Sequence, residues 1–151
     1  MSSFRYLKFP SFPIDEIEEW TYMGCPNIYT FVNMGKISHP CFDEKELEKY
    51  LPNNTCCDEP YLIKYESGGE FLRHKDLQIN EDHIGAVLIY PPFGKFEGGE
   101  LVVETSSGVL SLKNTSIDYL MVIVSITDYH EVKKILNGTR YVFLSPWFKK
   151  M

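Results

Sequence analysis

Three side chains of this sequence have the types and the spacing of a metal site. His74 and Asp76 lie two residues apart just after an apolar stretch, and His130 follows 54 residues after Asp76, just after a second one. Residues i and i+2 of a β-strand point to the same side, so His74 and Asp76 can reach one ion. A chain segment of that length can cross a barrel and return with His130. Two imidazoles and one carboxylate on one face of an octahedron leave three positions open, which predicts a non-haem Fe(II) centre.

The His-x-Asp pair is a weak signal when it is taken alone. With four histidines and seven aspartates in 151 residues, such a pair is expected by chance about 0.2 times. The competing interpretation is a histidine at a strand end that pairs with Asp76 and binds no metal.

Arg140 adds a second chemical feature, because it lies ten residues past His130 and two residues after the glycine of a predicted Asn-Gly turn. A guanidinium can bind a carboxylate through two parallel hydrogen bonds. On the strand that follows His130, it could hold the distal carboxylate of a dicarboxylic keto acid that chelates the metal. The competing interpretation is a solvated surface ion pair, which explains neither the turn nor the register with His130.

The metal residues need a framework of strands, and the sequence from residue 61 onward predicts one. Short segments rich in aromatic and β-branched residues alternate with turn residues such as those at 67–69 and 137–138. Short strands at spacings of about 8–12 residues are typical of a sandwich or a barrel. The predicted strands are residues 61–65, 71–73, 85–90, 100–104, 109–112, 119–124 and 141–144.

The first sixty residues instead predict helices and irregular segments. Residues 14–20 form a short acidic helix candidate behind Pro13, and residues 43–51 form a second, with Asp43 as its N-cap and Pro52 as its stop. Helices first and strands afterwards predict a mainly β, α+β protein. We therefore expect one domain over residues 1–151, in which residues 1–60 support a β core at 61–148.

Composition and charge exclude several classes of function. The chain has 15 basic and 21 acidic side chains, a net charge of −6 and no Lys/Arg cluster, so nucleic acid is a disfavoured partner. No apolar run reaches the ~18 residues of a membrane span, and residues 1–13 lack the apolar core of a signal peptide. No zinc-type spacing relates the four cysteines. We expect a cytoplasmic or nuclear protein with reduced thiols and no membrane contact. The sequence does not indicate its oligomeric state.

Several segments resemble the prolyl hydroxylase branch of the 2-oxoglutarate/Fe(II)-dependent dioxygenases. Residues 65–76 (YESGGEFLRHKD) are similar to the first metal-binding motif of that family. Residues 88–90 (LIY) and 97–101 (EGGEL) resemble its next strand and its Gly-Gly turn. Residues 130–132 (HEV) and 139–141 (TRY) are close to the equivalent segment of the oxygen-sensing, hypoxia-inducible-factor prolyl hydroxylases. The resemblance covers residues 61–148, with four motifs in the same order.

The resemblance implies a double-stranded β-helix, or jelly roll, of the cupin-like kind, with iron inside the mouth of the barrel. It implies that the metal ligands are those proposed above, that Arg140 clamps the C5 carboxylate of 2-oxoglutarate, and that Tyr90 donates a hydrogen bond to the same carboxylate. Tyr65 would line the pocket beside the cosubstrate. Because the chain has ten tyrosines, the competing interpretation for Tyr90 and Tyr65 is ordinary packing.

The sequence departs from the oxygen-sensing subgroup on its last strand. Leu144 stands where those enzymes have a threonine, and Trp147 comes one residue later than their tryptophan, so no role is carried over to Trp147. His83 lies in a polar loop and is expected to be solvated.

These observations predict an oxidoreductase that uses Fe(II), 2-oxoglutarate and dioxygen, with ascorbate as reductant, to hydroxylate a prolyl residue in a peptide or protein. Beyond the metal ligands, no further catalytic residue is predicted. Two alternatives stay open: an oxygenase of the same kind that acts on another protein side chain or a small molecule, and a catalytically silent binding module of the same fold. A third, a nucleic-acid demethylase, is disfavoured by the acidic charge.

Overall fold

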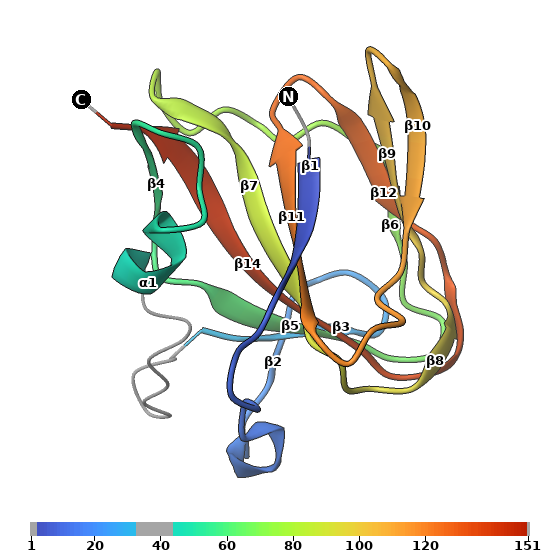
Figure 1. The fold of residues 1–151 in the computed structure, drawn as a ribbon. Coiled ribbons are helices and arrows are strands. Elements are labelled where there is room, and N and C mark those ends of the chain that lie inside the picture. Colours follow the sequence, from blue (N-terminus) through green and yellow to red (C-terminus); the bar gives the residue numbers. More distant parts are fainter. Residues whose placement is uncertain (1–2, 33–43, 151) are drawn as a thin grey trace.

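The computed structural model describes residues 3–32 and 44–150, and their fold is almost entirely β (Figure 1). The elements in chain order are β1 (Ser3–Leu7), η1 (Ile14–Glu16), β2 (Thr21–Tyr22), β3 (Ile28–Phe31), α1 (Glu44–Glu48), β4 (Thr55–Cys57), β5 (Tyr61–Tyr65), β6 (Phe71–His74), β7 (His83–Tyr90), β8 (Phe96–Gly98), β9 (Leu101–Thr105), β10 (Gly108–Leu112), β11 (Tyr119–Ser125), β12 (Tyr129–Val132), β13 (Ile135–Gly138) and β14 (Arg140–Lys149). No described helix is long and apolar enough to cross a membrane.

Two antiparallel sheets face each other across the interior of the molecule. The major sheet has the order β1-β11-β7-β14-β5-β3-β2, with β4 paired to β14, and the minor sheet has the order β10-β9-β12-β6. A separate pair, β13 with β8, closes one end. From β5 onward the chain repeatedly leaves the major sheet for another sheet and returns to it, which is how a jelly roll winds. The predicted double-stranded β-helix is therefore confirmed.

The major sheet is covered on both faces, which explains the unbroken apolar runs of its central strands. β7 and β11 contain almost only buried residues. One face packs against the minor sheet, and alternate side chains of the other face pack against the N-terminal segments and α1. The inner cluster includes Ile63, Leu88, Val103, Val122 and Val142, and the outer one includes Phe12, Leu47, Leu62, Ile89, Met121, Phe143 and Trp147.

The N-terminal region differs from the sequence prediction. The helix predicted over residues 14–20 is only the 3-10 turn η1. The second helix is α1, which ends at Glu48; Asp43, its predicted N-cap, lies outside the described residues. After α1 the backbone continues with i→i+3 hydrogen bonds up to Leu51, so the predicted last turn is tighter than an α-helix. Four short strands, β1 to β4, were not predicted; they pair within the major sheet and extend it.

Candidate metal centre

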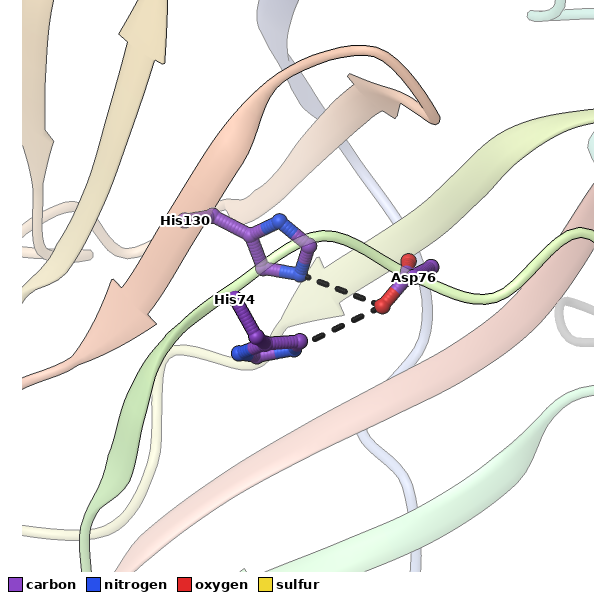
Figure 2. A group of neighbouring side chains, drawn as sticks. All are labelled: His74, Asp76 and His130. Carbon is purple, nitrogen blue, oxygen red and sulfur yellow. Dashed lines mark ion pairs between the residues drawn. The ribbon is translucent and has the colours of Figure 1, made fainter.

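His74, Asp76 and His130 meet at the end of the minor sheet, as Figure 2 shows. His74 ends β6 and is paired directly with His130 of β12, so both rings project from the same face. Asp76 follows two residues after His74. One Asp76 carboxylate oxygen lies 3.5 Å from Nε2 of His74 and 3.4 Å from Nε2 of His130. The three ligand atoms lie within 4.8 Å of one another, close enough to hold one metal ion.

The backbone orients both imidazoles for this task. Nδ1–H of His74 donates to the carbonyl of Leu72 at 2.6 Å, and Nδ1–H of His130 donates to the carbonyl of Asp128 at 3.3 Å. These bonds fix the tautomer and leave Nε2 of each ring directed at Asp76. When the rings are also protonated at Nε2, their hydrogen bonds to Asp76 hold the pKa of its carboxyl well below its usual range, and the bond to Asp76 raises the pKa of His74. An ionised carboxylate and two imidazole nitrogens together form a suitable set of ligands for a divalent cation.

A cavity of about 320 Å³ lies between the two sheets and includes the three metal-site residues in its wall. Its major-sheet wall follows β14 from Arg140 to Pro146 and the neighbouring strands β5 and β7. Burial decreases along this wall: Arg140 is 1% exposed, whereas Leu144 and Pro146 are only partly buried. The cavity therefore has a closed end at Arg140 and a mouth near Pro146.

Arg140 occupies the closed end between two tyrosine rings. Its guanidinium lies 4.7 Å from the ring centroid of Tyr65 and 4.6 Å from that of Tyr90, in the range of cation–π attraction. Its Nη2 donates to the Tyr90 hydroxyl at 2.7 Å. Burial raises the pKa of Tyr90, and it raises the pKa of Tyr65 to about 12. Both phenols therefore keep their protons at neutral pH.

Two hydrogen-bond donors at the closed end have no acceptor among the described residues. Nη1 of Arg140 is buried without a partner, and the Tyr90 oxygen, which accepts from Arg140, retains its own hydrogen for a further bond. No described carboxylate forms an ion pair with Arg140. Because a buried charge without a partner is costly, these groups fit a carboxylate that enters the cavity. The residues present thus fit Fe(II) at the histidines and Asp76, and 2-oxoglutarate with its distal carboxylate at Arg140.

The backbone at Gly138, the last residue of β13, sets the position from which the Arg140 side chain enters the cavity. Gly138 has φ +88°, a left-handed conformation that favours glycine. A Cβ at Gly138 would lie 2.0 Å from the carbonyl oxygen of Lys95, so the backbone of β13 approaches residue 95 closely. The Asn-Gly pair that the sequence predicts as a turn instead ends β13 and pairs with β8, so that Thr139 alone separates β13 from Arg140 at the start of β14.

The structure brings all six predicted site residues, His74, Asp76, His130, Arg140, Tyr90 and Tyr65, into the wall of one cavity. Their roles as ligands and clamps stay predictions. The prediction for His83 is wrong: it is 4% exposed and lines the same cavity. Its ring is held between two backbone groups, a constraint that its polar sequence neighbours do not reveal.

Several further cavity residues were not singled out from the sequence for a role here. Phe71 packs against His74, with ring centroids 4.3 Å apart, and Tyr61 and Pro146 line the mouth. Strand periodicity could have found Tyr61, because it lies four residues before Tyr65 on the same face. Trp147 faces the outer cluster rather than the cavity, consistent with assigning it no role at the site.

Comparison with known proteins confirms the resemblance seen in the motifs. No protein-family model matches the chain. It is 28% identical over 123 residues to a PKHD-type hydroxylase of Aliarcobacter butzleri. The match covers 76% of this chain and 50% of that protein. Among solved structures, it resembles an oxidoreductase of the 2OG-Fe(II) oxygenase family from Burkholderia pseudomallei, with a TM-score of 0.66, 15% identity, and 86% of this chain and 71% of that chain covered.

A second structural neighbour is the prolyl hydroxylase of Trichoplax adhaerens in complex with a peptide fragment of hypoxia inducible factor. Its TM-score is 0.60 at 18% identity, with 85% of this chain and 66% of that chain covered. Identities this low show the fold, which is the double-stranded β-helix of 2-oxoglutarate oxygenases. This chain spans about half the length of the curated relative that it matches.

Proposed function

We propose that the protein is a 2-oxoglutarate- and Fe(II)-dependent dioxygenase that hydroxylates a prolyl residue in a peptide or protein. When bound, Fe(II) and 2-oxoglutarate supply the chemistry by which dioxygen converts a C–H bond to C–OH while 2-oxoglutarate becomes succinate and carbon dioxide. Ascorbate would serve as reductant for the iron. The observation that carries the proposal is a buried arginine with an unpaired donor in the same cavity as a His/Asp/His set.

The residues of this chain would bind and orient the reactants. His74, Asp76 and His130 would hold the iron through Nε2, a carboxylate oxygen and Nε2. Arg140 and Tyr90 would hold the far carboxylate of 2-oxoglutarate, which fixes the direction in which the cosubstrate lies in the cavity. The closed end excludes water around these groups, because Arg140, Tyr65 and Tyr90 are all buried.

The prolyl substrate is supported by likeness to hydroxylases and by the shape of the cavity. The mouth is lined by partly buried apolar residues of β14, Leu144 and Pro146. An opening of this kind suits an extended chain, and proline favours the extended polyproline II conformation. The two alternative hypotheses are an oxygenase that acts on a different side chain or a small molecule, and a silent binding module. The tests below distinguish them from prolyl hydroxylation.

Metal binding is the first test. The wild-type protein is expected to bind one Mn(II), used as an inert substitute for Fe(II), and His74→Ala, Asp76→Ala or His130→Ala should abolish detectable binding because each removes one of three ligands. Calorimetry on the purified apoprotein measures this. Asp58→Ala, which removes an exposed carboxylate outside the cavity, is the control. Unchanged stoichiometry in the His74→Ala/His130→Ala double variant would refute the metal site.

Substrate oxidation is the second test. Proline-containing peptides are incubated with the protein, Fe(II), 2-oxoglutarate and ascorbate, and both succinate and peptide mass are followed. A gain of one oxygen atom on proline that disappears in His130→Ala supports prolyl hydroxylation. Succinate production with oxidation only at other residues would keep the oxygenase and remove the prolyl claim. No succinate with any peptide, although Mn(II) and 2-oxoglutarate bind, would favour a small-molecule substrate or the silent binding module.

A further inference from the structure

Two strongly exposed apolar side chains stand at the mouth of the cavity. Leu77 is 90% exposed and Ile79 is 63% exposed, yet both contribute to the cavity wall. They lie two residues apart in the segment between β6 and β7, directly after Asp76. Apolar side chains that line a cavity and also project into solvent are typical of surfaces that a ligand covers.

The segment that carries these side chains is held in place by His83. The Ile79 N–H donates to Nδ1 of His83 at 3.0 Å, and Nε2–H of His83 donates to the carbonyl of Gly85 at 2.8 Å, which corresponds to one neutral tautomer. The side chain of Gln78 donates to the His83 carbonyl at 3.2 Å. Leu77 and Ile79 are therefore exposed on a hydrogen-bonded backbone, and little further ordering is required when a ligand covers them.

Among the residues that the structure describes, those lining the mouth across from Leu77 and Ile79 are uncharged. Tyr61, Leu144 and Pro146 line it from β5 and β14. Apart from histidines, the charged side chains among the described residues of the cavity wall are Asp76 and Arg140. In the proposed function one is occupied by the metal and the other by 2-oxoglutarate. A charged substrate group would then enter a desolvated site without a partner, which is unfavourable.

The size of the cavity limits how much of the substrate can enter. Its volume of about 320 Å³ is at the lower end of the range for ligand pockets, and 2-oxoglutarate would occupy part of it. Only a small group of the substrate can reach the metal-site residues, so the remainder must lie outside, against the exposed rim.

We propose that Leu77 and Ile79 are substrate-contacting residues that select an uncharged, apolar group presented by a polypeptide segment. The inference rests on the proposed function, because it assigns Asp76 and Arg140 to the metal and cosubstrate. The peptide backbone lies across the rim, and the apolar side chain passes between Leu77 and Ile79 on one side and Leu144 and Pro146 on the other.

The test uses neutral substitutions, which leave the charge near Asp76 unchanged. Leu77→Ser/Ile79→Ser is compared with Ile117→Ser/Leu136→Ser, a control pair of similar exposure, 91% and 69%, that does not line the cavity. The probes are labelled, capped glycine–serine peptides whose central residue is proline, leucine, glutamate or lysine. Fluorescence anisotropy measures the binding of these peptides to the protein in the presence of Mn(II) and 2-oxoglutarate. Calorimetry on the same samples measures whether Mn(II) and 2-oxoglutarate themselves bind.

The expected result is that the proline and leucine peptides bind at least about tenfold more tightly than the glutamate and lysine peptides. The rim variant should lose about tenfold in affinity for the apolar probes, since each substitution removes apolar surface from the contact. Its Mn(II) and 2-oxoglutarate binding should be unchanged, and the control pair should bind like the wild type.

Equal binding of charged and apolar probes, wild-type affinity in the rim variant, or no binding of any peptide at millimolar concentration would overturn the inference. The first two results leave the proposed function standing if Mn(II) and 2-oxoglutarate still bind, whereas the absence of any peptide binding would also count against its peptide substrate. Absence of 2-oxoglutarate binding in the wild type would instead reject the proposed function, and with it the inference, which assigns Arg140 to the cosubstrate.

Discussion

At the scale of single residues, Arg140 separates the proposed site from a histidine–aspartate cluster without a function. A surface arginine needs no explanation, but Arg140 is 1% exposed with an unpaired Nη1. Its partners in the described part of the chain are two phenol rings and one hydroxyl. None of these neutralises its charge, so the site is incomplete without an anion.

Changes at the closed end should therefore act on 2-oxoglutarate binding. Arg140→Ala is expected to weaken it by about 2–5 kcal/mol, because a buried carboxylate would lose its charged partner. Arg140→Lys should be intermediate, since lysine offers a point charge without the planar fork. Tyr90→Phe should cost about 1.5 kcal/mol, one hydrogen bond to a charged group. Calorimetric titration of the Mn(II)-loaded protein measures each value.

The matched control for this series is Arg73→Ala. Arg73 is an exposed arginine paired with Glu104 on the minor sheet, and its removal should leave the affinity for 2-oxoglutarate unchanged. Affinity equal to the wild type in Arg140→Ala would show that the clamp is wrongly assigned.

The sequence indicated His74, Asp76 and Arg140 because the features that mark them lie within a few residues of each one. His74 and Asp76 are two residues apart, and Arg140 follows two residues after Gly138, the glycine that ends β13. The role of His83 could not be seen in this way, because its partners are backbone groups of Ile79 and Gly85. Every segment offers such groups, so only the folded geometry selects them.

At the scale of elements, the segment between β6 and β7 connects Asp76 to the mouth of the cavity. His83→Ala removes the acceptor of the Ile79 N–H, and hydrogen exchange of that amide should accelerate by about tenfold, as expected when about 1.4 kcal/mol of local protection is lost. The amide of Ser107, held by Thr105 in the β9–β10 hairpin, provides an internal control. Equal protection of Ile79 in variant and wild type would mean that His83 does not hold the segment.

Strand prediction was accurate where aromatic and β-branched residues were continuous and weak where strands were short. All seven predicted strands occur in the structure, with shifts of a few residues at their ends. β14 was predicted only to residue 144 but extends to Lys149, through Pro146. A proline fits there because, on one side of β14, Pro146 lies between the residues that pair with β5, which end at Leu144, and those that pair with β4, which begin at Trp147. On the other side, the register with β7 shifts just after it, between Trp147 and Phe148. The strands β1 to β4 gain their stability from the sheet they join, which local sequence does not show.

At the scale of the whole molecule, the site and the N-terminal layer lie on opposite faces of the major sheet. Phe12→Ala should lower the free energy of unfolding by about 3 kcal/mol, because Phe12 is 3% exposed and packs edge-on against Phe143 with centroids 5.0 Å apart. Chemical denaturation measures this loss. Mn(II) stoichiometry should be unchanged in the folded variant.

The control for packing is Val109→Ala, which shortens a side chain that is 67% exposed on β10. Its stability should stay within about 0.5 kcal/mol of the wild type. If Phe12→Ala were equally mild, the N-terminal segment would contribute little to the outer cluster, and the proposed support by residues 1–60 would be reduced to α1 and the short strands.

The two-faced sheet also has a spectroscopic consequence. Both tryptophans of the chain lie on the outer side of the major sheet. Trp147 is part of the outer cluster, and Trp20 packs against that cluster. Nζ of Lys64 lies 4.5 Å from the centroid of the Trp20 ring. Neither lines the cavity. We therefore expect the wavelength of intrinsic emission to report on the packing of the N-terminal segments against the outer cluster, and to shift when that packing is lost on denaturation.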